Sequence, residues 1–177
     1  GLLGVPAVLG GATAMNAGTR FGEMSDTLEE VEVFISGSLE RLPASALGLR
    51  YRHSDIPEGA IITRVRLKLT ESTPEDVQAK LDQVDAARNG QPKQKSAGCA
   101  FKNPVGHSAG KLIDKAGLKG TKVGDAMVSL EHGNFIVNLG NATAKDVIAL
   151  LDLIRQRLKI QSNHSVVLET EWQLWGF

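Results

Sequence analysis

A strand pattern that gives way within a few residues to a helix pattern is the strongest constraint on how this chain can fold. Residues 60–70 alternate with the period of two that is typical of a half-buried strand. Thr73 and Pro74 then supply a helix N-cap and a proline suited to the first helical position, and Asn89-Gly90 supplies a left-handed end. We therefore expect a strand, then a helix, and a change of structural unit between Thr70 and Pro92. The predicted strand faces are Ile61, Thr63, Val65, Leu67 and Leu69 on one side and Ile62, Arg64, Arg66 and Lys68 on the other.

The other segments show the same two periods and predict an α+β fold. Residues 28–35 have the pattern of a strand that ends at a turn at Ser36-Gly37. Residues 1–22 are rich in glycine and alanine and follow neither period, which favours close backbone approach, either around a ligand or in tight packing. The remaining predictions are a helix capped by Ser108, a hairpin of Ala126–Leu130 and Asn134–Leu139, a helix with a capping box at Thr143, and a final strand from Val166 to Trp172.

Composition and charge narrow the functional classes. The 177 residues suffice for one domain or two small ones, and 42% apolar with 23% charged content is typical of a soluble folded protein. Twenty basic and twenty acidic residues leave no net charge, so no nucleic-acid or membrane partner is expected, and no apolar run is long enough to span a bilayer. Nothing in the sequence indicates the oligomeric state. One cysteine suits a reducing compartment, which makes the cytoplasm the expected location. No metal site is expected, because the histidines lie far apart in the sequence, at His53, His107, His132 and His164.

One motif allows a hydrolase. Residues 106–110 match G-x-S-x-G, which places an exposed serine between a strand and a helix in serine hydrolases, and Asp152 and His164 follow in the order of such a triad. Pro104 argues against a buried strand before this motif, and an N-cap role explains Ser108 as well. A serine hydrolase therefore stays open as an alternative. The same glycines are too closely spaced for a phosphate loop, and no G-x-G-x-x-G follows a predicted strand.

Three further segments carry candidate chemistry. Cys99 lies between small residues and a Lys-Asn-Pro sequence, where a thiol of ordinary pKa (about 8.5) can donate a proton or simply be a small buried hydrophobe. The arginine of Tyr51-Arg52-His53-Ser54 suits a surface ion pair or a stacking contact as well as a catalytic role. Glu169 and Glu171 lie on the same side of the predicted final strand, where a solvated edge is the simpler interpretation.

Taken in order, these segments resemble one family: the flavin-dependent UDP-N-acetylenolpyruvoylglucosamine reductases, also called UDP-N-acetylmuramate dehydrogenases or MurB. The resemblance covers nearly the whole chain, and in this family residues corresponding to 106–110 form an ordinary helix start. The short stretch between Lys68 and Ser96, and the absence of an insertion between Pro104 and Gly110, resemble the compact second type of the family. The segments that carry the resemblance are Gly1–Gly22 with Met-Asn-Ala-Gly at 15–18, Tyr51–Ser54, Ser96–Pro104, Gly106–Leu118, Val128–Asn138 and Leu168–Gly176.

The resemblance implies an enzyme of peptidoglycan precursor synthesis. In this family NADPH reduces bound FAD, and a hydride then passes to the enolpyruvyl group of UDP-N-acetylglucosamine enolpyruvate, which becomes UDP-N-acetylmuramate. The resemblance also implies that Cys99 is the proton donor, that Arg52 holds the substrate carboxylate and stabilises the enolate, and that Glu171 assists. Thr170 and Gln173 stand where the family usually has a proline and an arginine beside this glutamate.

Further contacts and the domain organisation are implied in the same way. The first domain, residues 1–72, is expected to be part of a flavin-binding domain of the vanillyl-alcohol-oxidase-like type, and residues 73–177 a substrate-binding domain whose last strand can return to the first. Family members carry an N-terminal lobe with a Gly-Ser-Asn phosphate loop, so we expect these residues to be the C-terminal part and to bind FAD weakly or not at all alone. A non-catalytic fragment that retains the fold is a further alternative. The implied flavin contacts are Gly4, Pro6, Gly10, Gly11, Asn16 and Gly18, and the implied substrate contacts are Tyr51, Asn103 and His132.

Overall fold

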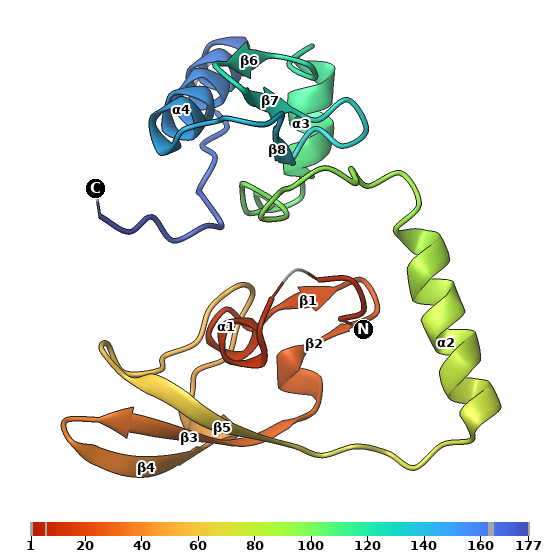
Figure 1. The fold of residues 1–177 in the computed structure, drawn as a ribbon, viewed down its shortest axis with the longest axis vertical. Coiled ribbons are helices and arrows are strands. Elements are labelled where there is room, and N and C mark those ends of the chain that lie inside the picture. The colour runs from red at the N-terminus through yellow and green to blue at the C-terminus, as the bar shows by residue number, and fades with distance from the viewer. Residues whose placement is uncertain (1, 6, 163–164, 177) are drawn as a thin grey trace. The chain divides into compact units, whose positions relative to one another are not determined.

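The chain forms both helices and strands. The computed structural model describes residues 2–5, 7–162 and 165–176. It divides into two compact units, Gly1–Arg88 and Asn89–Phe177 (Figure 1). Each unit has a buried apolar cluster of its own. All strand pairs among the described residues are antiparallel. The fold is therefore mixed α and β.

A three-stranded sheet in the order β4-β3-β5 forms the base of the first unit. β3 (Leu28–Ile35) confirms the strand predicted there, and it contributes the buried Val31 and Val33 to the core. β4 (Ser38–Pro43) pairs along β3 and is followed by the 3-10 turn η2 (Ala44–Ala46). The sequence did not predict β4, because its two leucines are three residues apart, which is not the spacing of a strand.

The third strand, β5 (Ile61–Leu67), confirms the segment predicted between 60 and 70 but corrects its faces. Ile62 pairs with Val33 and Arg64 with Glu32, so the intervening Thr63 is an extra residue in the strand. Such a bulge exchanges the two faces of a strand at the point where it occurs. As a result Ile62 packs against the core while Ile61 is 62% exposed, the reverse of the predicted arrangement.

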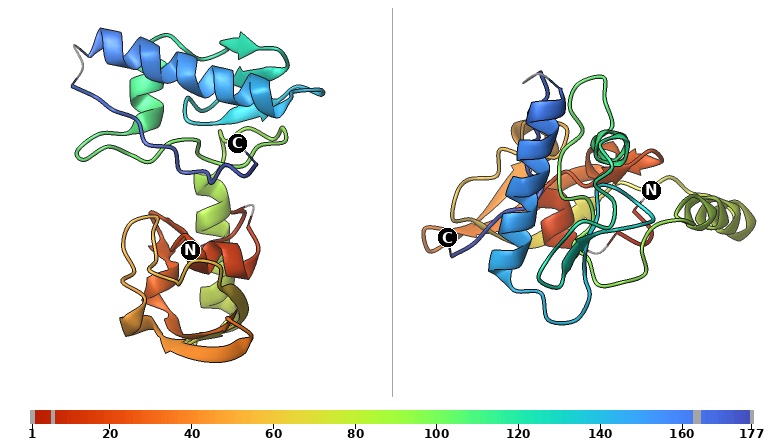
Figure 2. Two further views of the ribbon diagram at one scale, coloured as in Figure 1. Left: turned by 90° about the vertical axis from the view of Figure 1, so that its left-hand side faces the viewer. Right: turned by 90° about the horizontal axis from the view of Figure 1, so that it is seen from above.

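The glycine-rich start of the chain folds into short elements that the sequence did not predict. They are α1 (Leu9–Ala14), the two-residue strands β1 (Gly18–Thr19) and β2 (Gly22–Glu23), and the 3-10 turn η1 (Met24–Asp26). α1 lies over the sheet (Figure 2) and contacts β5. Its Ala12 is part of the buried core of the unit. A helix this short contains too few turns for a detectable apolar period, and its two glycines lower its helix propensity.

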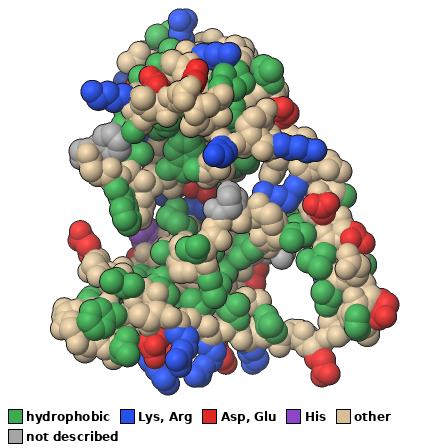
Figure 3. All heavy atoms as spheres, viewed as in Figure 1, with side chains coloured by type: hydrophobic (Ala, Val, Ile, Leu, Met, Phe, Trp, Pro, Cys, Tyr) green, Lys and Arg blue, Asp and Glu red, His purple; other side chains and the backbone are tan. Residues whose placement is uncertain are grey.

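Helix α2 (Pro74–Ala87) begins where the sequence predicts. The Thr73 hydroxyl accepts a hydrogen bond of 3.1 Å from the Asp76 N–H, which confirms the N-cap. Val84 is its buried residue, whereas Val77 is 46% and Leu81 39% exposed. Apolar and acidic side chains stand side by side along this helix in Figure 3. α2 therefore gains little from packing within its own unit.

Two helices and a small sheet form the second unit. The sheet has the order β6-β7-β8, and β7 (Ala126–Val128) and β8 (Ile136–Asn138) confirm the predicted hairpin in a shorter form. α4 (Ala144–Gln161) contacts β7 and β6 (Lys122–Val123), and α3 (Ala109–Lys115) contacts α4.

Both helices of the second unit begin at the predicted caps. Ser108 caps α3, and Thr143 forms a capping box with Asp146 at the start of α4. α4 presents one apolar stripe to the core, in which Leu150, Leu151, Ile154 and Leu158 are all buried. These side chains form the core of the unit together with residues of α3 and of the hairpin.

The predicted final strand from Val166 to Trp172 is wrong. This segment makes one isolated bridge, between Thr170 and Phe101, although Leu168 and Val167 alternate between buried and exposed as they would in a strand. The partner segment cannot extend the pairing, because it reaches Pro104, which has no N–H to donate.

The described ranges hold neither a membrane-spanning helix nor a cluster of metal-binding side chains. None of the helices there is long and apolar enough to cross a bilayer. Within the same ranges, no three His, Cys, Asp or Glu side chains come together as a metal-binding group.

Candidate functional site

The first candidate cluster is a two-residue turn that carries Tyr51 and Arg52. Two backbone hydrogen bonds between Arg50 and His53 close the turn. The Arg50 N–H donates to the His53 carbonyl oxygen at 3.1 Å, and the His53 N–H donates to the Arg50 carbonyl oxygen at 3.0 Å. Arg52 has a φ of +54°, a left-handed conformation that is uncommon for a residue with a side chain. The closed turn fixes the points at which the two side chains leave the backbone.

The guanidinium of Arg52 reaches back to the N-terminal segment. Its Nη2 donates to the Gly18 carbonyl oxygen at 2.6 Å and its Nη1 to that of Asn16 at 3.5 Å, while its Cζ lies 4.9 Å from the centroid of the Tyr51 ring. A Cβ at Gly18 would lie 2.5 Å from the Glu23 Cβ and 3.3 Å from Arg52 Nη1. Glycine at this position is therefore needed for the close approach of β1, β2 and the arginine.

Asn16 links the turn to two other segments. It is fully buried with a φ of +40°, and its Nδ2 donates to the Arg50 carbonyl oxygen at 3.2 Å. Its Oδ1 accepts a hydrogen bond of 2.9 Å from the N–H of Ser25 in η1. The structure thus brings Asn16 and Gly18 together with Tyr51 and Arg52.

The other predicted flavin contacts are spread along the start of the chain. Gly10 and Gly11 lie in the first turn of α1, and the Gly4 carbonyl oxygen accepts a hydrogen bond of 2.6 Å from Arg88. Pro6 lies outside the described residues. No side chain in the described part of the chain caps α1, and the first N–H groups of a helix have no acceptor within it. Since glycine leaves these groups uncovered, this backbone fits the flavin contacts that the resemblance implies.

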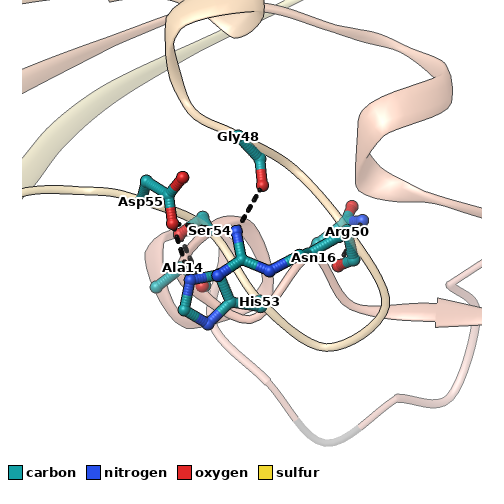
Figure 4. Close-up of polar contacts among 7 residues, drawn as sticks. All are labelled: Ala14, Asn16, Gly48, Arg50, His53, Ser54 and Asp55. Carbon is teal, nitrogen blue, oxygen red and sulfur yellow. Dashed lines mark hydrogen bonds and ion pairs between the residues drawn. The ribbon is translucent and has the colours of Figure 1, made fainter.

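A carboxylate that the sequence analysis did not single out joins both ends of the turn. Oδ1 of Asp55 accepts a hydrogen bond of 2.9 Å from Arg50 Nη1 and lies 2.8 Å from His53 Nε2 (Figure 4). These two hydrogen bonds, that from Arg50 first, lower the pKa of Asp55, so the carboxylate is ionised at neutral pH. The only sequence signal for it is an acidic residue two positions after His53.

The second candidate cluster surrounds Cys99, which is partly exposed. Cys99 forms an isolated antiparallel bridge with Phe135, and the Ala100 N–H donates to the Asn134 carbonyl oxygen at 2.8 Å. The buried Asn134 side chain accepts from the Phe101 N–H at 3.0 Å and donates to the Phe101 carbonyl oxygen at 2.8 Å. One buried amide therefore holds the backbone two residues after the thiol. This role of Asn134 could not be predicted from the sequence, because nothing local relates it to Phe101.

Glu171 lies along the other side of the Cys99 segment. Its N–H donates to the Ala100 carbonyl oxygen at 2.9 Å, and Thr170 bridges Phe101. The Thr170 hydroxyl accepts a hydrogen bond of 3.1 Å from Arg155. The structure thus places the backbone of Glu171 against that of Ala100, the residue after Cys99, and it gives Thr170 a hydroxyl contact that proline could not make.

His132 joins the same cluster through Asn134. Its Nδ1 accepts a hydrogen bond of 3.2 Å from the Asn134 N–H, which assigns the proton of the neutral ring to Nε2. The ring meets Phe135 edge to face, with 4.8 Å between centroids. Burial, and then the charge of Lys119, lower the pKa of His132 below its ordinary value of 6.5. The imidazole is therefore neutral at pH 7.

Asn103 and Ser108 both serve the start of α3. The Asn103 Oδ1 accepts a hydrogen bond of 2.9 Å from the Ala109 N–H, and the Ser108 Oγ accepts one of 3.4 Å from the Lys111 N–H. Ser108 therefore acts as the N-cap of α3, and this role accounts for a serine at position 108 without a hydrolase function.

The other two residues of the possible hydrolase triad, Asp152 and His164, give this alternative no support. Asp152 pairs with Arg155 at 2.9 Å, and His164 lies outside the described residues.

A mostly apolar cavity of about 380 Å³ borders the Cys99 segment. Trp172 contributes to it, and its buried Nε1 has no hydrogen-bond partner within the described part of the chain. The lining residues are Lys95, Ser96, Ala97, Ile136, Val137, Asn138, Val147 and Trp172.

Comparison with known proteins covers both units. A family profile of the UDP-N-acetylenolpyruvoylglucosamine reductase C-terminal domain matches residues 91–175. The chain is 58% identical over 175 residues to UDP-N-acetylenolpyruvoylglucosamine reductase of Thermus thermophilus, a match that covers 99% of the chain and 63% of that protein. The reductase of the same name from Deinococcus radiodurans is 56% identical, with 99% and 58% covered.

A solved structure of a reductase from the same family is also similar to this chain. The crystal structure of UDP-N-acetylenolpyruvylglucosamine reductase (MurB) from Thermus caldophilus superposes with a TM-score of 0.91 at 58% identity, covering 99% of this chain and 63% of that one. The chain therefore spans 58% to 63% of the length of these relatives. Because both the profile of the second unit and the identity across both units agree, the chain belongs to the UDP-N-acetylenolpyruvoylglucosamine reductase family.

Proposed function

We propose that this chain supplies part of an enzyme that uses NADPH to reduce UDP-N-acetylglucosamine enolpyruvate to UDP-N-acetylmuramate, a step of peptidoglycan precursor synthesis in the cytoplasm. The observation that carries the proposal is the 58% identity over 175 residues to a reductase named for this substrate class. The clusters around Arg52 and Cys99 offer an anion-binding group and an acid, the two functions that such a reduction needs from protein side chains.

In this proposal Arg52 binds the substrate carboxylate. A guanidinium presents its N–H donors in a planar fork that matches two carboxylate oxygens, and its charge stabilises the enolate that forms next. The bonds to Gly18 and Asn16 support this role because they hold the side chain in place before substrate arrives. Tyr51, beside the guanidinium, contacts the substrate.

Cys99 is the proposed proton donor. After a hydride adds to one carbon of the enolpyruvyl double bond, negative charge develops on the other carbon and the carboxylate. The S–H proton of Cys99 passes to that carbon and leaves a thiolate. Glu171, whose backbone bonds to Ala100, assists in stabilising or protonating the intermediate.

The remaining roles concern binding. Neutral His132 offers its Nε2–H to an acceptor on the substrate, and Asn103 is a second proposed contact. FAD supplies hydride transfer from NADPH to the enolpyruvyl double bond. We assign its contacts to Pro6, Asn16 and the backbone of Gly4, Gly10, Gly11 and Gly18. Residues 1–72 are in this view part of a flavin-binding domain of the vanillyl-alcohol-oxidase-like type, and residues 73–177 a substrate-binding domain.

The test uses a fused protein, in which the part of the Thermus thermophilus relative that lies outside the match is joined to this chain. Purified fused protein is supplied with FAD, NADPH and UDP-N-acetylglucosamine enolpyruvate. NADPH oxidation is followed by absorbance, and the product by mass spectrometry. We expect stoichiometric formation of UDP-N-acetylmuramate. No turnover by a folded fusion that contains flavin would instead indicate a non-catalytic relative.

Cys99→Ala and Cys99→Ser separate proton donation from the other steps. Cys99→Ala should lower the rate of product formation about 10²- to 10⁴-fold, as the loss of a general acid does, while NADPH still reduces the flavin. Cys99→Ser should retain much of the activity, because a hydroxyl can donate in the same place. Normal turnover by Cys99→Ala would show that another group is the acid.

A further inference from the structure

The turn that carries Arg52 holds a conformation that needs external support. Arg52 has a φ of +54°, and two backbone hydrogen bonds between Arg50 and His53 close the turn. The turn lies outside the named strands, and Tyr51 within it is 46% exposed. Side chains that bond to Arg50 and His53 therefore add to the constraint on the turn.

Asp55 supplies that constraint at both ends of the turn. One carboxylate oxygen, Oδ1, contacts Arg50 Nη1 at 2.9 Å and His53 Nε2 at 2.8 Å, and these two residues are the ones that close the turn. The same Nη1 of Arg50 also donates to the Gly48 carbonyl oxygen at 3.0 Å. Figure 4 shows the Arg50 side chain reaching the Gly48 carbonyl, with Asp55 and His53 beside it. Arg50 and His53 are thus held by a single acceptor as well as by their backbones.

The surrounding backbone is shaped to admit this carboxylate. Gly48 has a φ of +49°, and a Cβ at this position would overlap Asp55 Oδ2. The Asp55 N–H donates to the Leu47 carbonyl oxygen at 2.7 Å, and Leu47 is fully buried. The acceptor is therefore anchored to the core of the unit, although its oxygens reach solvent.

We propose that Asp55 is a positioning residue, which holds the Tyr51–Arg52 turn through Arg50 and His53 and so aims Arg52 at the substrate carboxylate. This inference rests on the proposed function of Arg52. Two hydrogen bonds support the same arrangement from the other side, since Asn16 donates to the Arg50 carbonyl oxygen and Ser54 Oγ donates to that of Ala14 at 2.7 Å.

A double-mutant cycle in the fused protein tests the proposal by kinetics. Asp55→Asn should lower kcat/KM for the enolpyruvyl substrate about tenfold, the usual effect of losing a charged hydrogen bond, and Arg52→Ala should lower it further. If Asp55 acts through Arg52, the double variant should match Arg52→Ala, because the interaction has already been lost. A double variant about tenfold below Arg52→Ala would mean independent effects and would overturn the proposal. Unchanged kcat/KM in Asp55→Asn would overturn it as well.

A second measurement does not depend on activity and uses the unfused chain. Tyr51 is the only tyrosine of these 177 residues, so ring ¹³C labelling of tyrosine gives an NMR signal that reports on the turn alone. Asp55→Asn should shift that signal, because the ring faces the guanidinium of Arg52 at 4.9 Å. Glu58→Gln removes an exposed carboxylate from the same loop and is the matched control, for which no shift is expected. If Asp55→Asn shifts the signal but Arg52→Ala leaves kcat/KM unchanged, then Asp55 holds the turn and the proposed role of Arg52 is wrong. An unshifted signal would show that Asp55 does not hold the turn.

Discussion

At the scale of single residues, two buried asparagines shape the surroundings of the proposed catalytic groups. Asn16 holds the Arg50 carbonyl oxygen, and Asn134 holds both backbone groups of Phe101. In each case a side-chain amide takes the place of a backbone hydrogen-bond partner, because the chain is too irregular there to form the hydrogen bonds of a sheet. The resemblance to the family implies a flavin contact for Asn16, whereas the hydrogen bonds of its side chain to Arg50 and Ser25 lie within the protein.

Asn134 allows a stability prediction. Asn134→Ala leaves the N–H and the carbonyl oxygen of Phe101 without their partner in a buried place, so it should lower the free energy of unfolding by about 2–4 kcal/mol. Urea denaturation followed by tryptophan fluorescence measures this, because Trp172 and Trp175 are the two tryptophans of the chain and both belong to the second unit. The exposed Asn141→Ala is the control, with a change expected within about 0.5 kcal/mol. Equal effects of the two variants would contradict the role of the amide.

His132 allows a prediction on pH. Its pKa in the folded state is lowered from 6.5, chiefly by burial, so between 6.5 and the lower folded value the unfolded chain binds more protons. Stability should therefore rise with pH across that interval and fall as the solution becomes more acidic. His132→Asn keeps an acceptor near the Asn134 N–H but does not titrate, and it should flatten this part of the curve. Urea midpoints at pH 5, 6 and 7 measure the slope, with exposed His107→Asn as the control. A slope unchanged in His132→Asn would assign the effect elsewhere.

At the scale of helices and strands, caps were predictable and register was not. Thr73, Ser108 and Thr143 begin helices where the sequence places them, because capping depends on residues within one turn. The bulge at Thr63 depends on the partner strand, and nothing in residues 60–70 reveals it. The segment 166–172 alternates like a strand, yet its partner ends at Pro104. Local signals therefore fix the ends of elements, whereas pairing needs the distant chain.

The capping box of α4 gives a prediction for that helix. The Thr143 hydroxyl accepts from the Asp146 N–H at 3.2 Å, and the Asp146 carboxylate accepts from the Thr143 N–H at 2.8 Å. Thr143→Ala should lower the free energy of unfolding of the second unit by about 1 kcal/mol. Thr73→Ala removes the corresponding cap of α2 in the first unit, and it should leave the tryptophan-detected transition unchanged. If Thr73→Ala shifted the tryptophan-detected transition as much as Thr143→Ala does, the two caps would not be independent.

At the scale of the whole molecule, the proposed catalytic residues are divided between the two units. Arg52 belongs to the unit that ends at Arg88, whereas Cys99 and Glu171 belong to the unit that begins at Asn89. Composition bounds only the number of domains, whereas the strand, helix and turn signals between Thr70 and Pro92 already predict a change of unit there, and the division between Arg88 and Asn89 falls within that range. The structure gives each unit its own buried cluster, so each can be perturbed separately.

Separate cores predict separate unfolding. A fragment of residues 89–177 should fold alone and unfold cooperatively, with the tryptophan-detected midpoint that the whole chain shows, because within the described ranges its buried core cluster begins at Ala100. Leu47→Ala empties a fully buried site in the first unit and should cost that unit about 2–5 kcal/mol. The Tyr51 signal should then report earlier unfolding of the first unit while the tryptophan midpoint stays in place. If Leu47→Ala instead lowered the tryptophan midpoint, or if the fragment failed to fold, the second unit would depend on the first, and the two clusters would have to be treated as one cooperative structure.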